Sequence, residues 1–276
     1  MGVLSDTLEI ILKNRKEILS YTTKVRHLIS HGKQNILILG TGGAGKSTLG
    51  KLLGGEYDQI LAGKAYEQSI ERENYSYKGK VFGSVIVGPG QTDKRRRIWP
   101  DLIKKLEDGE INGVIYVVAA GYNSSTELEP QEHPLFKKMN TSSIPRFMTL
   151  FKKDNMNEEV RILSQELLPG LVMAPRPIWF MTVILKQDLW WRNKDSALQW
   201  YRTGPYGKVI KEIAKARRGS RKFAYELVPA SLVIENLLSP NHKTLLAETA
   251  SGFDTVKQVE SVRLLTRVIS ELAGAK

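Results

Sequence analysis

The spacing of apolar residues along the chain predicts helices and strands that alternate. Short continuous apolar runs indicate buried strands, and apolar positions three or four residues apart indicate one face of a helix. The predicted strands lie at residues 35–39, 81–87, 111–120, 178–184 and 224–229, with a further strand and turn near 75–80. The predicted helices lie at residues 3–31, 47–53, 93–106, 157–168, 195–217 and 254–273. This order predicts an α/β fold with a doubly wound, mostly parallel sheet.

The same pattern suggests how the chain is divided. Residues 1–32 form an N-terminal amphipathic helix, whose simplest role is to dock on the rest of the chain. Residues 33–276 read as one domain without an interdomain linker. Within it, residues 121–145 are rich in Ser, Asn, Pro and Glu and predict an insertion or long loop. Pro169-Gly170 is expected to end the helix that precedes it.

Composition narrows the classes of function. The chain has 276 residues, a formal net charge of +12 and no cysteine. The absence of cysteine excludes disulfides, thiolate metal sites and cysteine nucleophiles. The positive charge favours an anionic partner such as an acidic protein or an anionic membrane surface. Nucleic acid is not favoured, because no module combining aromatic and basic residues is visible.

One segment carries the chemistry. Residues 40–47 read GTGGAGKS and fit the P-loop pattern G-x-x-x-x-G-K-[ST], between a predicted strand and a predicted helix. Such glycines let several backbone N–H groups point at one anion, and the helix N-terminus adds partial positive charge. Lys46 is predicted to reach the β- and γ-phosphates of a nucleotide, and the Ser47 hydroxyl to bind Mg²⁺. The residues predicted to hold the phosphates are Gly42, Gly43, Ala44, Gly45, Lys46, Ser47 and Thr48.

A P-loop draws on cellular pools of Mg²⁺ and nucleotide, so a cytoplasmic protein is expected. Two basic clusters and the N-terminal helix leave peripheral contact with a membrane, or with an acidic partner, open. The first cluster is Lys94–Arg97, and the second contains Lys208, Lys211, Lys215, Arg217, Arg218, Arg221 and Lys222.

Four short segments follow the P-loop in a distinctive order: Tyr66–Glu71, Val87–Gln91, Leu185–Asp188 and Val228–Leu232. Over roughly residues 35–235 their order resembles that of the Ras-like P-loop GTPase superfamily, with local motifs similar to those of the Arf and Gα branches. The resemblance implies a small-GTPase-like fold that binds GTP or GDP together with Mg²⁺.

The resemblance also implies roles around the γ-phosphate. Gly90 and Gln91 match the family's γ-phosphate-sensing glycine and water-orienting glutamine. Ser69 stands at the position of the Mg²⁺-binding threonine. Val87 stands where the family has an aspartate associated with Mg²⁺, which implies weaker dependence on Mg²⁺ or slower turnover. Residues 95–97 are an alternative source of an internal arginine finger.

Two segments are candidates for the family's guanine-reading motif N-K-x-D. One is Leu185–Asp188, which follows a clear strand, and the other is Phe151–Asp154, with Lys152 and Asp154 in the matching positions. In the preferred first segment, the Asp188 carboxylate would accept hydrogen bonds from guanine N1–H and the exocyclic amine. Adenine offers neither donor, so guanine is favoured. Lys186 would lie along the base.

One residue of this segment departs from the family, and one short match follows the last predicted strand. Leu185 replaces the asparagine that ties this loop to the P-loop. Ser231 stands where a backbone N–H of the family contacts guanine O6.

The leading prediction is therefore a GTP-binding switch that hydrolyses GTP slowly, with Gln91 and Lys46 as catalytic residues. Hydrolysis would release the loops near residues 60–76 and 88–98 and so change the binding of a protein effector or regulator. Val87 and Leu185 favour an alternative, a nucleotide-binding interaction module with little or no turnover. A further alternative is an ATP-using P-loop enzyme, which would make the match at Asp188 accidental.

Overall fold

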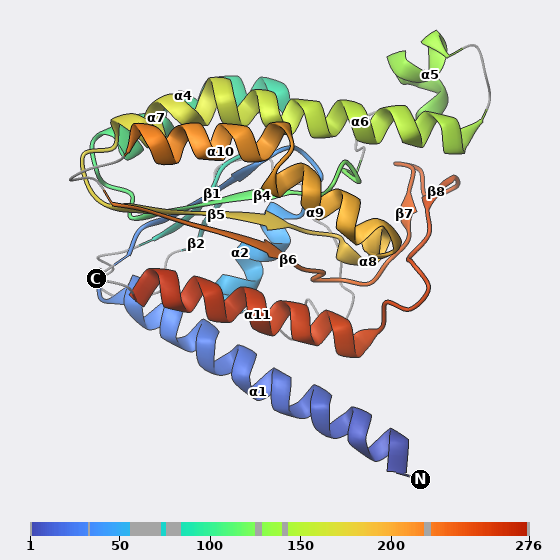
Figure 1. The fold of residues 1–276 in the computed structure, drawn as a ribbon, viewed down its shortest axis with the longest axis horizontal. Helices are drawn as coiled ribbons and strands as arrows, with labels where there is room; N and C mark the ends of the chain where they lie inside the picture. The colour runs from blue at the N-terminus through green and yellow to red at the C-terminus, as the bar shows by residue number, and fades with distance from the viewer. Residues whose placement is uncertain are drawn as a thin grey trace.

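The structure is a computed structural model that describes residues 2–32, 34–55, 73–75, 84–124, 129–139, 143–217 and 222–274. The described residues contain a six-stranded sheet of order β2-β3-β1-β4-β5-β6, in which β2 runs antiparallel to β3 and the other pairs are parallel (Figure 1). The strands are β1 (Ile36–Gly40), β2 (Glu73–Tyr75), β3 (Val85–Val87), β4 (Gly113–Val118), β5 (Ile178–Ile184) and β6 (Phe223–Pro229). This topology confirms the predicted doubly wound, mostly parallel α/β fold.

Helices cover both faces of the sheet. Figure 1 shows α4, α6, α7 and α10 above the sheet and α1, α2 and α11 below it. The helices are α1 (Gly2–Ser30), α2 (Lys46–Gly54), α4 (Thr92–Glu107), α5 (Pro134–Lys138), α6 (Ile144–Ile162), α7 (Leu168–Met173), α8 (Gln187–Trp190), α9 (Lys194–Arg202), α10 (Pro205–Ala216) and α11 (Thr255–Gly274). Successive side chains of β4 alternate between two apolar cores, with Val114 and Tyr116 in the upper one and Ile115 and Val117 in the lower one. A strand buried on both faces explains why its sequence is continuously apolar.

The N-terminal helix α1 lies along α11 (Figure 1). Ile18, Val25 and Ile29 are buried and belong to the same apolar core as the underside of the sheet. Leu8 and Leu12 on the same helix remain exposed. The amphipathic stripe predicted from sequence therefore faces the body of the molecule over the C-terminal part of α1. Within the part of the chain described here, no helix is both long enough and apolar enough to cross a bilayer.

The helix predicted at residues 157–168 is longer than its sequence indicates, and its predicted end is wrong. It begins as α6 at Ile144, passes through a π-helical turn at Leu163–Leu167 and continues as α7 through Pro169 and Gly170. Pro169 is tolerated because it lies in the first turn of α7, after the π-helical turn has already changed the hydrogen-bond pattern. A Cβ on Gly170 would lie 2.7 Å from Ile103 Cγ2, so the glycine permits close packing on α4.

Two regions of the chain contain short elements that were not predicted. The stretch 121–145 contains a 3₁₀ turn at Pro130–Glu132 as well as α5, while residues 125–128 and 140–142 lie outside the description. After β6, Leu237–Leu238 (β7) and Leu245–Ala247 (β8) pair as an antiparallel hairpin. Strands this short show no alternation, so periodicity cannot detect them. The hairpin matters because it borders the site described next.

Candidate functional site

The P-loop joins the end of β1 to the start of α2, and its glycines are sterically required. Gly40, Gly43 and Gly45 have φ values of +147°, +67° and +102°, and all three lie in the positive range that favours glycine. A Cβ on Gly40 would overlap the Val117 carbonyl oxygen, and one on Gly43 would overlap the Ser124 carbonyl oxygen. At Gly40 and Gly43 the loop therefore lies too close to neighbouring backbone for any side chain.

Lys46 lies within this cradle. It is 5% exposed, and its Nζ donates a hydrogen bond of 2.7 Å to the Thr41 carbonyl oxygen. Ser47 follows it in the first turn of α2, and Thr48 borders the cavity described below. A buried ammonium group and a helix N-terminus at one place form an anion-binding site.

The segment after β3 lies against the cradle. A Cβ on Gly90 would overlap Lys46 Nζ and lie 2.6 Å from Gly42 N. Trp99 Nε1 holds the turn from behind by donating a 2.9 Å hydrogen bond to the Pro89 carbonyl oxygen. Gly90 therefore lies next to Lys46 and Gly42, two of the residues predicted to hold the phosphates.

Gln91 begins α4 beside the P-loop. Its Cγ lies 3.8 Å from the position that a Cβ on Gly42 would take. Its Oε1 is buried and has no hydrogen-bond partner among the described residues. A buried acceptor without a donor suits a site that water or a ligand completes.

The described residues offer few ligands for Mg²⁺. Val87 is fully buried in the apolar core below the sheet and cannot contribute. Ser69 lies outside the described residues. The described residues hold no group of three or more His, Cys, Asp or Glu side chains that would bind a metal ion. Ser47 remains, and it fits a Mg²⁺ that takes most of its other ligands from phosphates and water.

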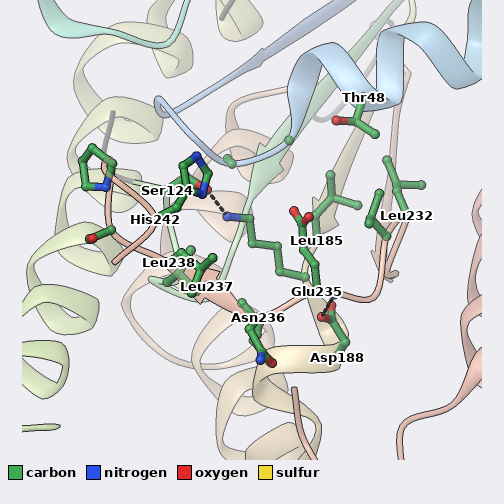
Figure 2. Close-up of a pocket in the computed structure, with 17 residues that line it drawn as sticks. Thr48, Ser124, Leu185, Asp188, Leu232, Glu235, Asn236, Leu237, Leu238 and His242 are labelled. Carbon is green, nitrogen blue, oxygen red and sulfur yellow. Dashed lines mark hydrogen bonds between the residues drawn. The ribbon is translucent and has the colours of Figure 1, made fainter. Parts of the chain in front are cut away.

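A cavity of about 550 Å³ opens beside the P-loop at the carboxyl ends of the strands (Figure 2). Ligands of doubly wound sheets bind at this edge. Its walls come from the P-loop and α2, the loop after β4, the loop after β5 and the segment after β6. The lining residues are Ala44, Gly45, Thr48, Ser124, Leu185, Lys186, Asp188, Leu189, Leu232, Val233, Glu235, Asn236, Leu237, Leu238, Ser239, Pro240 and His242.

Asp188 lies at one end of this cavity, with Glu235 beside it and Thr48 at the other end (Figure 2). Its Oδ1 accepts a 2.5 Å hydrogen bond from Ser231 Oγ, and its Oδ2 accepts one of 3.3 Å from the Glu235 N–H. Burial raises the pKa of Asp188, and these hydrogen bonds and the nearby Lys186 ammonium oppose the rise. An ionised carboxylate has about four acceptor positions, so Asp188 keeps capacity for further donors.

Lys186 crosses the cavity from a left-handed backbone position with φ of +57°. Its Nζ donates a 2.7 Å hydrogen bond to Ser124 Oγ. Burial lowers the pKa of Lys186 to about 8, while the Glu235 and Asp188 carboxylates raise it. The ammonium group is therefore mostly charged at neutral pH.

The structure distinguishes the two candidates for the base-reading motif by position. Residues 151–154 lie inside α6, where the Lys152 ammonium stacks over the Tyr122 ring at 4.7 Å and donates to the Tyr122 hydroxyl oxygen. Asp154 is exposed, and neither Lys152 nor Asp154 lines the cavity. Lys186 and Asp188 line it, which favours the segment preferred from sequence.

Ser231 acts on Asp188 through its hydroxyl group. Its backbone N–H donates a 3.1 Å hydrogen bond to Ser261 Oγ, and Ser231 is not among the residues that line the cavity. A guanine O6 would have to compete with Ser261 for this donor. The contact between the Ser231 N–H and guanine stays a prediction.

Sequence reasoning missed Asn123 and Ser124, which hold the P-loop from the side. Asn123 Nδ2 donates hydrogen bonds of 2.5 Å to Thr41 Oγ1 and 2.9 Å to the Gly42 carbonyl oxygen. The Ser124 N–H donates one of 3.1 Å to the Gly43 carbonyl oxygen. The available signal was their place directly after a predicted parallel strand, but they fell within the stretch assigned to an insertion.

The basic clusters are less uniform than their sequence indicates. Arg95 is 2% exposed, forms ion pairs with Glu158 (3.0 Å) and Glu166 (3.1 Å), and stacks over Trp99. It is thereby withdrawn from any role as an arginine finger. Arg217 is equally buried and donates hydrogen bonds to the carbonyl oxygens of the α7 end, at Leu171, Ala174 and Arg176. The exposed members of the clusters include Arg96, Arg97, Lys208, Lys211, Lys215 and Lys222.

No protein-family model and no curated protein matches the chain, but solved structures do. One is an ADP-ribosylation-factor-like GTP-binding protein, the small COPII coat GTPase SAR1 from Encephalitozoon cuniculi in complex with GDP. It is 13% identical, with a TM-score of 0.37, over 98% of this chain and 92% of that chain. The signal recognition particle receptor SRb-GTP/SRX complex from Chaetomium thermophilum is 14% identical, with a TM-score of 0.42, over 73% and 92%. The mammalian SRP receptor is 12% identical, with a TM-score of 0.40, over 87% and 100%. The fold of this chain rests on its own strand order.

Proposed function

We propose that this protein is a GTP-binding switch that hydrolyses GTP slowly. The observation that carries the proposal is the cavity of about 550 Å³, because it joins the P-loop to Lys186 and Asp188. These segments lie far apart in the sequence. The P-loop would hold the phosphates, and Lys186 and Asp188 would contact guanine, as their resemblance to the family's base-reading motif implies. A change of nucleotide at this cavity would alter the surface near residues 88–98 and so the binding of a protein partner.

The phosphate end of the site uses charge and backbone donors. The N–H groups of residues 42–48 and the Lys46 ammonium group would hold the phosphates in the glycine cradle. Mg²⁺ bound with the nucleotide would neutralise phosphate charge, with Ser47 as its ligand from the described residues.

The base end of the site uses Asp188. Its free acceptor positions would receive guanine N1–H and the exocyclic amine, while Ser231 and the Glu235 N–H fix the orientation of the carboxylate. The Lys186 side chain would lie along the base, and its ammonium group is fixed by Ser124. Both contacts proposed between Asp188 and guanine need donors on the base. Adenine lacks these donors, so it would leave acceptor positions of the buried carboxylate without hydrogen bonds.

Hydrolysis would depend on Gln91. Its unpartnered Oε1 beside Gly42 would accept a hydrogen bond from water and turn the oxygen lone pair of that water toward the γ-phosphorus. The Gly90 N–H would contact the γ-phosphate. Val87 leaves this region without the usual carboxylate, which is the reason for proposing slow turnover.

The guanine assignment is tested by exchanging Asp188 for asparagine. Asp188→Asn should weaken GTP binding by about ten-fold or more and leave ATP binding nearly unchanged, since only guanine uses both acceptors. It should strengthen binding of xanthosine triphosphate, because xanthine has a carbonyl at C2 that the new amide can donate to. Titration calorimetry with the three nucleotides measures this. Equal affinity of the unmodified protein for GTP and ATP, or a preference for ATP, would refute the guanine assignment.

A nucleotide-binding module without turnover is the second candidate, and buried Val87 favours it. Single-turnover phosphate release decides between the two. In a GTPase, Gln91→Leu should lower the hydrolysis rate by about 10²-fold, because the water loses its acceptor, while GTP affinity stays similar. If the unmodified protein and Gln91→Leu both release phosphate only as fast as GTP hydrolyses in buffer without protein, the protein is a binding module.

A further inference from the structure

The loop after β5 has no polar connection to the P-loop at the position where one is expected. Leu185 is 2% exposed and packs on the P-loop through carbon, since its Cδ1 lies 2.8 Å from where a Cβ on Gly45 would be. An aliphatic side chain fills space here but cannot orient peptide groups. If the cradle is held in one conformation, another element must hold it.

The loop after β4 makes the missing connection. Asn123 is 4% exposed, and its Nδ2 donates to Thr41 Oγ1 and to the Gly42 carbonyl oxygen. The next residue donates its N–H to the Gly43 carbonyl oxygen. Three consecutive residues of the cradle, 41–43, are thereby held from one side.

The same loop also contacts the base-reading segment. Ser124 Oγ accepts a hydrogen bond from Lys186 Nζ. Asp188 lies two residues after Lys186, and both residues line the cavity of about 550 Å³. Ser124 therefore touches both the cradle and the base-reading loop. A displacement of one of these two loops would therefore move the contacts that Ser124 makes with the other.

The loop is rigid enough to act as an anchor. Gly121 packs on the backbone of Lys152 in α6, and its carbonyl oxygen accepts a 3.1 Å hydrogen bond from Asn155 Nδ2. The Ala119 N–H donates to Glu159 Oε1 of the same helix at 3.3 Å. These contacts join residues 119–121 to α6, so the packing of α6 on the sheet helps to set the position of Asn123.

We propose that Asn123 is a positioning residue of the nucleotide site. It holds residues 41–43 in the receiving conformation and supplies the anchor that Leu185 lacks. The proposal rests on the proposed function in one respect only, which is that the P-loop binds a nucleotide; it does not depend on which base is bound.

The test uses Asn123→Ala and the isosteric Asn123→Asp, each titrated with GTP and with ATP. Both variants should weaken binding of the preferred nucleotide by about ten-fold or more, and Asn123→Asp at least as strongly, because it turns a donor into an acceptor facing the Gly42 carbonyl oxygen. The ratio of GTP to ATP affinity should stay the same, in contrast to Asp188→Asn. The exposed Asn157→Ala on α6 is the matched control and should bind as the unmodified protein does.

Rescue separates positioning from general damage. Adding Leu185→Asn to Asn123→Ala places an amide on the opposite side of the cradle and should recover at least part of the lost affinity. Unchanged affinity in the Asn123 variants, or no recovery in the double variant, overturns the proposal. If the unmodified protein binds neither nucleotide, the proposed function and this inference both fail; if it binds only ATP, the guanine assignment fails and the Asn123 experiment still decides.

Discussion

Gly90 approaches the P-loop more closely than a side chain permits. A Cβ there would overlap Lys46 Nζ and press on the Gly42 nitrogen at 2.6 Å, and that nitrogen belongs to backbone that cannot swing away. The importance of a glycine at this position was deduced from a resemblance in sequence, and the steric reason comes from the structure. Val87 shows the converse, since its sequence position suggested a lost metal contact and its burial shows an apolar packing role.

Gly90→Ala should therefore separate the turn from the cradle. We expect it to weaken binding of a nucleoside triphosphate by about ten-fold or more and the diphosphate by less, because the turn contacts the γ-phosphate side. Titration calorimetry with both nucleotides measures the difference. Gly274→Ala on α11, where a Cβ meets nothing within 4 Å, is the control. Equal affinities for Gly90→Ala and the unmodified protein would show that the turn moves freely.

At the scale of elements, α6 joins the sheet through a buried carboxylate. Glu159 is fully buried and accepts hydrogen bonds from the Tyr201 hydroxyl (2.6 Å) and the Ala119 N–H (3.3 Å). It forms no ion pair with a cationic side chain of the described residues. Burial raises the pKa of Glu159 to about 7, against the lowering effect of these hydrogen bonds. Since Ala119 precedes the loop that carries Asn123, this carboxylate supports the candidate site from behind.

The pH dependence of stability follows from that pKa. Between the ordinary glutamate pKa of 4.5 and about 7, the folded protein keeps a proton that the unfolded chain has lost. Raising the pH through this range should therefore lower the free energy of unfolding, by up to about 3 kcal/mol when complete. Glu159→Gln removes the titration and keeps an acceptor for Ala119. Urea denaturation at pH 5 and pH 8 should show the unmodified protein losing stability relative to the variant; parallel behaviour would refute the assignment.

At the scale of the whole molecule, the N- and C-terminal helices pack together on one face of the sheet, with α1 against α11 (Figure 1). The buried stripe of α1 shares a core with α2, which begins at the P-loop. Leu8, Leu12 and Leu19 of α1 lie outside this stripe and are exposed. Most of the stability contributed by α1 must therefore come from its inner stripe.

Ile18→Ala should lower the free energy of unfolding by about 2–4 kcal/mol, because it leaves a cavity at a fully buried position. Leu12→Ala, at a position that is 55% exposed, should change it by less than about 0.5 kcal/mol. Chemical denaturation of the two variants measures both values. Equal effects would mean that α1 does not pack on α11 as described.

The sequence by itself determined the order of the main helices and strands, the parallel sheet and the P-loop. These features depend on local spacing, on glycine chemistry and on side chains at strand ends, all of which are written within short stretches. Only the tertiary structure shows that Asp188 and not Asp154 lines the cavity, that the helix continues through Pro169 after a π-helical turn, and that Arg95 is buried. It also revealed Asn123 at the cradle and Glu159 behind it. Each of these depends on contacts between segments far apart in the chain, where the partner rather than the local pattern determines what a residue does.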